Sequence, residues 1–178
     1  SYFFIALALF VFILIYFLGT PMLELIVSSK NILVASEIYL TIRVFGVLFA
    51  FGNLAFRSLL VGITQTKALG YSAFVMAATN VVLDYIFIFG HYGMPTMGIG
   101  GAALASVFSE LAALLFFIIY TFIKLDRNQY PIFKFPAIDF KIIGKTLELS
   151  IYVMAQYFLS ILTWFTFFAF IEQMGERS

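Results

Sequence analysis

The 178-residue sequence contains no cysteine, and few of its residues carry a charge. Without cysteine the chain has no disulfide framework, no thiolate metal site and no cysteine nucleophile. Charged residues make up 11% of the chain, whereas soluble domains average roughly a quarter. Ten basic and nine acidic residues give a formal net charge of +1, which leaves no basic surface for a nucleic acid. These shortages exclude a soluble globular domain, a disordered segment and a nucleic-acid-binding protein.

Histidine is also scarce, with one in the whole chain, and no serine stands beside a plausible base. The sequence therefore has no hydrolytic or metal-binding constellation, and we do not predict an enzyme. What is abundant is apolar: 63% of the residues are hydrophobic, and the mean hydropathy is +1.08. Such a composition is typical of a chain whose solvent is lipid.

The apolar residues are gathered into long runs. A helix needs about 20 apolar residues to cross a bilayer core. Five stretches approach or meet that length: residues 2 to about 18 (or past Pro21 to 27), 38–60, 69–89, 101–123 and 147–171. They are apolar all round rather than alternating, which argues against transmembrane strands. The sequence thus predicts an all-α integral membrane protein, a bundle of about five transmembrane helices.

The loops differ in their basic residues, and this difference orients the chain. The loops after the second and fourth spans lie on one side of the membrane. Seven basic residues belong to that side: Arg57, Lys67, Lys124, Arg127, Lys134, Lys141 and Lys145. The other side has two, Lys30 and Arg177. The positive-inside rule places the richer side, and with it the N-terminus, in the cytoplasm.

The long polar stretch divides the chain. Residues 124–145 include Pro131 and Pro136 and follow the fourth span. We predict four spans over 1–123, a cytoplasmic loop over 124–145 and one further span over 146–178, with 139–147 a candidate amphipathic helix at the membrane interface. The sequence starts without Met in an apolar run and stops just after a span. We therefore expect it to be the interior of a longer membrane protein; the alternative is a complete five-span protein.

Ionisable side chains inside a span are costly unless they are paired or hydrated, so each is a candidate functional group. Asp84 is the first candidate, because Asn80 lies one helical turn before it on the same face. A carboxylate and an amide oxygen together suit Na⁺, or a bound proton with a hydrogen-bond partner. Asp84 lies about 8 Å from the outer end of its span at 1.5 Å per residue. The alternative is that Asp84 snorkels outward or pairs with a basic residue.

Glu110 is the second candidate and lies deeper, near the middle of the fourth span, one turn after Ser106. Two interpretations stay open for it. Glu110 is either a second acceptor for a proton or cation, or a neutral packing carboxylic acid that is hydrogen-bonded to another helix.

Two arginines also fall within the second span. For Arg43 we expect a structural role, either paired with Asp84 or Glu37 or snorkelling outward. Arg57 lies near the cytoplasmic end of the span, where snorkelling to lipid phosphates accounts for it. A run of glycine and alanine over 98–105 is typical of a helix that approaches its neighbour closely.

Several short motifs together resemble a known family. They are Tyr-Leu-Thr-Ile-Arg-Val-Phe-Gly at 39–46, Phe-Arg-Ser-Leu-Leu-Val-Gly at 56–62 followed by Thr-Lys at 66–67, Asn-Val-Val-Leu-Asp at 80–84, and Gly-Ile-Gly-Gly-Ala-Ala-Leu-Ala-Ser at 98–106. In this order and spacing the sequence resembles the multidrug and toxic compound extrusion (MATE) family of secondary antiporters. The resemblance is specific over 37–123, fair over 149–178 and weak over the first 36 residues.

The resemblance implies a fold of twelve spans in two six-helix bundles. This chain would hold the third to sixth spans of the first bundle, the loop between the bundles and the first span of the second bundle. Asn80 and Asp84 match an Asn and an Asp that help to form the family's cation site, and Ser106 matches a hydroxyl residue that often joins them. Their usual partner, an acid on the family's first span, is absent from this chain. The acid that some members carry in the seventh span has no counterpart at 158–160.

The resemblance also implies a function. The expected protein is an antiporter coupled to Na⁺ or H⁺ that exports organic, often cationic, compounds, with no cofactor beyond the coupling ion. It would lie in the plasma membrane, the inner membrane of a bacterium. Its partners would be lipid, a small organic cation and the remaining helices of the full-length transporter.

Two other functions remain open. One is a flippase for lipid-linked oligosaccharides from the same superfamily, for which Arg43 is the local cue. The other is a membrane scaffold subunit without transport activity, in which Asp84 would face lipid or be neutrally paired.

Overall fold

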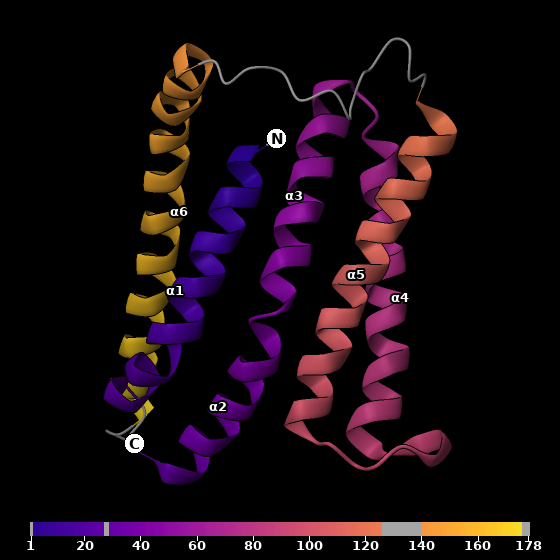
Figure 1. Cartoon of the computed structure of the whole chain (residues 1–178). Helices are drawn as coiled ribbons and strands as arrows, with labels where there is room; N and C mark the ends of the chain where they lie inside the picture. The colour runs from indigo at the N-terminus through magenta and orange to yellow at the C-terminus, as the bar shows by residue number, and fades with distance from the viewer. Residues whose placement is uncertain (1, 27–28, 126–139, 176–178) are drawn as a thin grey trace. The chain divides into compact units, whose positions relative to one another are not determined.

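The structure is a computed structural model that describes residues 2–26, 29–125 and 140–175, and these are almost entirely helical (Figure 1). The described part of the chain contains no strand, so the predicted all-α fold is confirmed. In chain order the elements are α1 (Tyr2–Ile26), α2 (Lys30–Arg43), α3 (Gly46–Gly62), α4 (Lys67–Phe89), the 3₁₀ turn η1 (His91–Gly93), α5 (Ile99–Lys124) and α6 (Phe140–Gly175).

The chain divides into two compact units, residues 1–133 and 134–178. The first contains α1–α5, and the second contains α6. Residues 140–145, which the sequence analysis assigns to a loop, form the first turns of α6. Most of that predicted loop, 126–139, lies outside the described residues, and the assignment of the two units to separate bundles stays a prediction.

Four of the described helices, α1, α4, α5 and α6, are long and apolar enough to cross a membrane. The helices α2 and α3 together make a fifth candidate span, bent by 50°. The first span takes the longer of its two predicted forms, since α1 continues through Pro21 to Ile26. The second span differs from the prediction, because it is two helices rather than one.

The break between α2 and α3 lies at Val44 and Phe45. The amide of Phe45 donates to the carbonyl of Ile42, and the amide of Val47 donates to the carbonyl of Val44. Both bonds reach back three residues instead of four, which tightens the turn and interrupts the α-helical ladder. No proline is present there; the residue that follows the break is Gly46. The backbone therefore bends where a glycine permits a close approach.

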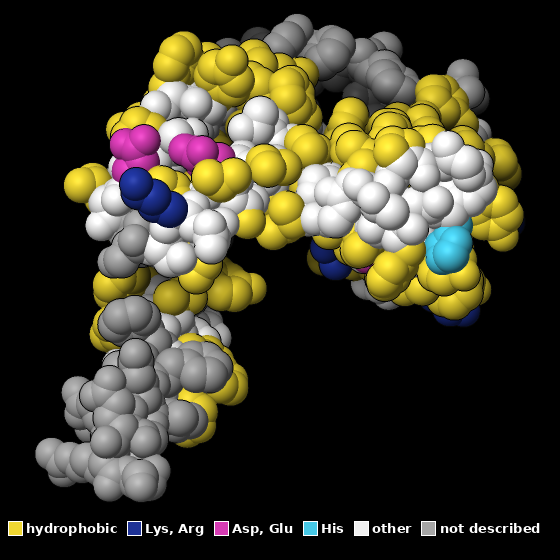
Figure 2. Space-filling model, turned by 90° about the horizontal axis from the view of Figure 1, so that it is seen from below, with side chains coloured by type: hydrophobic (Ala, Val, Ile, Leu, Met, Phe, Trp, Pro, Cys, Tyr) yellow, Lys and Arg dark blue, Asp and Glu magenta, His cyan; other side chains and the backbone are white. Residues whose placement is uncertain are grey.

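The surface is as apolar as a lipid-facing surface requires. Large hydrophobic side chains on every helix are exposed, among them Phe17, Phe74, Val81 and Ile123. Figure 2 shows hydrophobic side chains spread over the visible face, with few charged ones between them. Monomeric soluble proteins rarely expose so much contiguous apolar area. This surface is consistent with a bundle solvated by lipid.

The closest helix pair is α4 and α5, which lie side by side (Figure 1). The predicted small-residue run is the contact: Gly101, Ala103 and Ala105 on α5 are all buried. A Cβ atom at Gly101 would lie 2.7 Å from the backbone carbonyl of Phe87 on α4. Beyond this contact, toward the α3–α4 turn, Leu60, Ala68, Phe117 and Leu125 form the buried apolar cluster. The two contacts fix α4 against α5 at both ends.

Replacing Gly101 with alanine should therefore destabilise the bundle by about 1–3 kcal/mol, because backbone atoms cannot move aside as a flexible side chain can. Gly70→Ala is the matched control, since nothing lies within 4 Å of a Cβ at Gly70. It should be neutral or stabilising by up to about 1 kcal/mol. The measurement is the temperature at which the purified protein loses monodispersity in detergent. Equal behaviour of the two variants would refute the close α4–α5 contact.

Candidate ion site and the charge pair at the helix break

Arg43, in the last turn of α2, forms an ion pair with Glu110 near the middle of α5. Nη1 donates to Oε2 at 2.9 Å and Nη2 donates to Oε1 at 2.5 Å. This two-point geometry is the strongest form of arginine–carboxylate contact. The Glu110 side chain is only 13% exposed, so its charge depends on the arginine. The predicted pairing of Arg43 with Asp84 or Glu37 is wrong.

Gly46 explains why the pair forms at the break. A Cβ atom at Gly46 would overlap Nη1 of Arg43 and lie 2.8 Å from Oε2 of Glu110. Glycine therefore leaves the space that the pair occupies. The charges also suit the two helix ends. Arg43 is at the negative C-terminal end of α2, and the carboxylate of Glu110, which belongs to α5, lies beside Gly46 at the positive N-terminal end of α3. The pair thus holds the bend and joins it to α5.

Asn53 on α3 holds the same residue of α5 from a second direction. Its Nδ2 donates to the backbone carbonyl oxygen of Glu110 at 2.9 Å. Asn53 is 8% exposed, and its Oδ1 has no hydrogen-bond partner among the described residues. The sequence analysis did not select Asn53. The available signal was an amide inside the apolar stretch 47–56, where an unpaired polar group is costly.

The predicted cation ligands lie on two adjacent helices. Asn80 and Asp84 are one turn apart on α4, and Ser106 is on α5. No hydrogen bond in the structure joins these three side chains, so their grouping into one site stays a prediction. Ser106 accepts a hydrogen bond at its carbonyl oxygen from Oγ of Ser109, at 2.8 Å. Asp84 itself is half-buried.

Asp84 differs from Glu110 in what surrounds its carboxylate. Its Oδ1 is buried and has no hydrogen-bond partner in the described part of the chain. The described residues also provide no salt bridge to it. A carboxylate oxygen that is removed from water without a partner is costly. An ion or a proton at that oxygen would remove the cost, so Asp84 fits the predicted role of an ion ligand.

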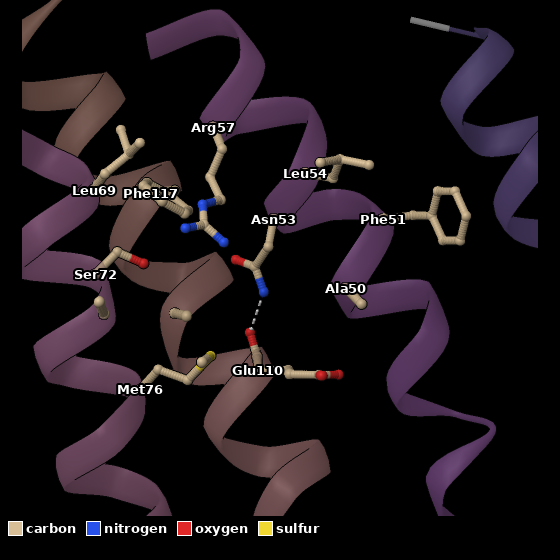
Figure 3. Close-up of a pocket in the computed structure, with 12 residues that line it drawn as sticks. Ala50, Phe51, Asn53, Leu54, Arg57, Leu69, Ser72, Met76, Glu110 and Phe117 are labelled. Atoms are coloured by element: carbon tan, nitrogen blue, oxygen red, sulfur yellow. Dashed lines mark hydrogen bonds between the residues drawn. The ribbon is translucent and has the colours of Figure 1, made fainter. Parts of the chain in front are cut away.

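A cavity of about 330 Å³ lies between α3, α4 and α5 (Figure 3). Its polar lining groups are Asn53, Arg57, Ser72 and Glu110. Its apolar lining residues are Ala50, Phe51, Leu54, Leu69, Ala73, Met76, Ala113 and Phe117. The guanidinium of Arg57 points into the cavity, level with Asn53, rather than along α3 toward its C-terminal end. Arg57 is nevertheless exposed, and its expected snorkelling to lipid phosphates stays a prediction.

These features define a multi-pass helical membrane protein with charged groups held between its helices. The profile of the MatE family matches residues 1–86 of the chain. The chain belongs to the MatE family, as its resemblance to the multidrug and toxic compound extrusion antiporters implies.

Curated relatives agree with this membership. A probable multidrug resistance protein NorM of Agrobacterium fabrum is 27% identical over 147 residues, 80% of this chain and 32% of the relative. A protein of the same name from Photorhabdus laumondii is 31% identical over 139 residues, 76% of this chain and 30% of the relative. The probable multidrug resistance protein YoeA of Bacillus subtilis is 29% identical over 110 residues, 62% and 23% respectively. The chain thus spans about a third or less of these relatives. No solved structure matches it.

The charge pair predicts strong coupling between Arg43 and Glu110. Arg43→Gln or Glu110→Gln alone should lower the free energy of unfolding by about 2–4 kcal/mol, because each leaves the other charge unpaired at membrane depth. The double variant should lose less than either single variant, since two amides can hydrogen-bond to each other. The measurement is SDS titration of the protein in mixed micelles. Additive losses in the double variant would contradict the pairing.

Proposed function

We propose that this chain is part of a secondary antiporter that exports organic, often cationic, compounds in exchange for Na⁺ or H⁺. Membership of the MatE family and the names of its curated relatives, probable multidrug resistance proteins, support export. The observation that carries ion coupling is the buried, unpartnered Oδ1 of Asp84 inside a candidate span. The coupling ion is a transported substrate here, and Asp84 is its proposed ligand.

Asn80 and Ser106 are the proposed neutral partners of Asp84. The two α4 residues share a helix face one turn apart, and Ser106 lies on α5, which packs directly against α4. Carboxylate, amide and hydroxyl oxygens are hard ligands that suit Na⁺, and the same groups accept or share a proton.

Glu110 is not proposed as a second ion ligand. Both of its carboxylate oxygens are already engaged by Arg43. An ion at Glu110 would have to displace the two hydrogen bonds from Arg43. At Asp84 it would bind a buried carboxylate oxygen that has no partner among the described residues. The contact with Arg43 favours a packing role for Glu110, but as the charged partner of an arginine rather than as the neutral acid that was predicted.

The pairing of Arg43 with Glu110 also removes the observation that favoured a flippase. That alternative needs cationic side chains that face a substrate cavity, and Arg43 was the local hint. Arg43 instead contributes its guanidinium to Glu110 across the α2–α5 contact. We therefore retain multidrug export as the proposed activity.

Ion binding would act by shifting a conformational equilibrium. An ion at Asp84 stabilises the arrangement of α4 and α5 in which its ligands converge, and its release favours the other arrangement. One elementary charge that moves across about 100 mV supplies roughly 2.3 kcal/mol, equivalent to about a fifty-fold gradient. That is enough to drive export of an organic compound. The remaining helices of the full-length transporter would provide the other wall of the substrate path.

Asp84→Asn should abolish export, because the amide cannot carry the charge that an ion neutralises. The measurement is efflux of ethidium from proteoliposomes that contain the protein at its full natural length. A sodium gradient and a pH gradient are imposed separately, and the one that drives efflux in the wild type identifies the coupling ion. Asn80→Ala should slow efflux with a weakened response to the driving gradient.

The matched control is Glu24→Gln, which removes an exposed carboxylate on α1. It should export at the wild-type rate. Undiminished efflux by Asp84→Asn, with a normal amount of protein in the membrane, would remove Asp84 from the mechanism.

We also propose an orientation, in a bacterial inner membrane, with the start of α1 and the α3–α4 turn in the cytoplasm and the α4–α5 connection outside. The excess of basic residues on one side supports it. The absence of native cysteine makes this testable with single cysteines. Met94→Cys in the α4–α5 connection should react with a membrane-impermeant maleimide on intact cells. Thr66→Cys before α4 should react only after the membrane is opened, and the reverse pattern would invert the topology.

A further inference from the structure

We propose that the cavity between α3, α4 and α5 is a second binding site, distinct from Asp84, that takes a small amphipathic organic anion. The cavity combines an arginine without a counter-charge among the described residues, a buried amide whose oxygen has no hydrogen-bond partner among them, and an apolar wall. The proposal goes beyond the coupling-ion site and does not depend on Asp84.

The charge in the cavity comes from Arg57. Of the described residues that line the cavity, two carry a full charge, Arg57 and Glu110. The Glu110 carboxylate is neutralised by Arg43 and points away from the centre of the cavity (Figure 3). Arg57 is an exposed residue whose guanidinium points toward the cavity, and among the described residues no hydrogen bond or ion pair is found for it. The cavity is therefore electropositive, and an anionic group would supply the missing counter-charge.

Asn53 provides an independent sign that the cavity is incomplete without a ligand. Asn53 is only 8% exposed, and its Oδ1 has no hydrogen-bond partner in the described part of the chain. Native structures rarely leave such an atom unpaired. Ser72, also buried, directs its hydroxyl into the same space from α4 (Figure 3). A ligand group that both accepts and donates hydrogen bonds, or an anion with an attached water, would satisfy these atoms.

The other residues that line the cavity are apolar, which favours a ligand with an apolar organic body. Phe51, Leu69, Met76 and Phe117 come from all three helices. A few convergent polar groups on an apolar wall are typical of sites for small organic molecules. The volume of about 330 Å³ is at the small end of such sites, which suits a body of one or two rings.

A lipid headgroup fits the position less well. The Arg57 guanidinium is level with Asn53, which precedes the end of α3 at Gly62 by nine residues. At 1.5 Å per residue this is roughly 13 Å inside the helix end. A phosphate at the membrane surface would attract Arg57 outward along α3, and the side chain takes the opposite direction.

The test compares two ligands that share a naphthalene ring system and differ in charge. Naphthalene-1-sulfonate is an anion, and naphthalene-1-sulfonamide is its neutral counterpart. Binding of each is measured by titration calorimetry to the protein at its full natural length, in nanodiscs of phosphatidylcholine. The wild type should bind the sulfonate at least about tenfold more tightly than the sulfonamide, as expected for a charged hydrogen bond. Arg57→Gln should remove that preference and leave sulfonamide binding unchanged, which also shows that the cavity is still folded.

Lys67→Gln is the matched control, because it removes one basic charge at the start of α4, outside the cavity. It and Asp84→Asn should both keep the preference, so failure of the proposed ion site leaves this result intact. Equal affinities for the two ligands, no binding of either, or a preference that survives Arg57→Gln would overturn the proposal. Loss of sulfonate binding in phosphatidylglycerol nanodiscs would assign the site to a lipid phosphate and would also overturn it.

Discussion

The ion pair between Arg43 and Glu110 is the contact on which the arrangement of α2, α3 and α5 depends. A charge at membrane depth has no water to solvate it, so each of the two residues requires the other. Their contact passes through the space that Gly46 leaves at the bend, and Asn53, about two turns further along α3, adds a bond to the backbone of Glu110. The two helices of this candidate span meet at a 50° bend, and two side chains attach them to Glu110 of α5.

The same pair separates structural from functional charges. Arg43 and Glu110 satisfy each other, whereas Asp84 keeps a buried carboxylate oxygen without a partner among the described residues. Arg57 likewise has no counter-charge among the described residues, and its guanidinium points toward a cavity. In the described part of α1–α5, Arg43 and Glu110 therefore neutralise each other, whereas no such partner is found for Asp84 or Arg57. An antiporter that handles both an ion and an organic compound needs groups of the second kind.

Much of the fold could be predicted from the sequence, because lipid imposes simple rules on helices. Run length located the spans, and the small residues around Gly101 correctly indicated a close helix contact. The bend at Val44 could not be predicted from local sequence, since no proline marks it and Glu110, which binds Arg43 beside it, lies 67 residues away. For the same reason the partner of Arg43 was misassigned: charge at depth shows that a partner is required, but helix packing decides which one. Asn53 was missed because a single amide in an apolar run has no spacing pattern.

The central claim is that Asp84 is the carboxylate that takes up the coupling ion and Glu110 is not. Difference infrared spectroscopy of the protein in lipid, recorded as sodium is added or as the pH is lowered, observes the carboxyl groups directly. The account predicts one carboxyl signal that disappears in Asp84→Asn and persists when Arg43 and Glu110 are both replaced with glutamine. A signal that survives Asp84→Asn and is lost in the double variant would contradict it.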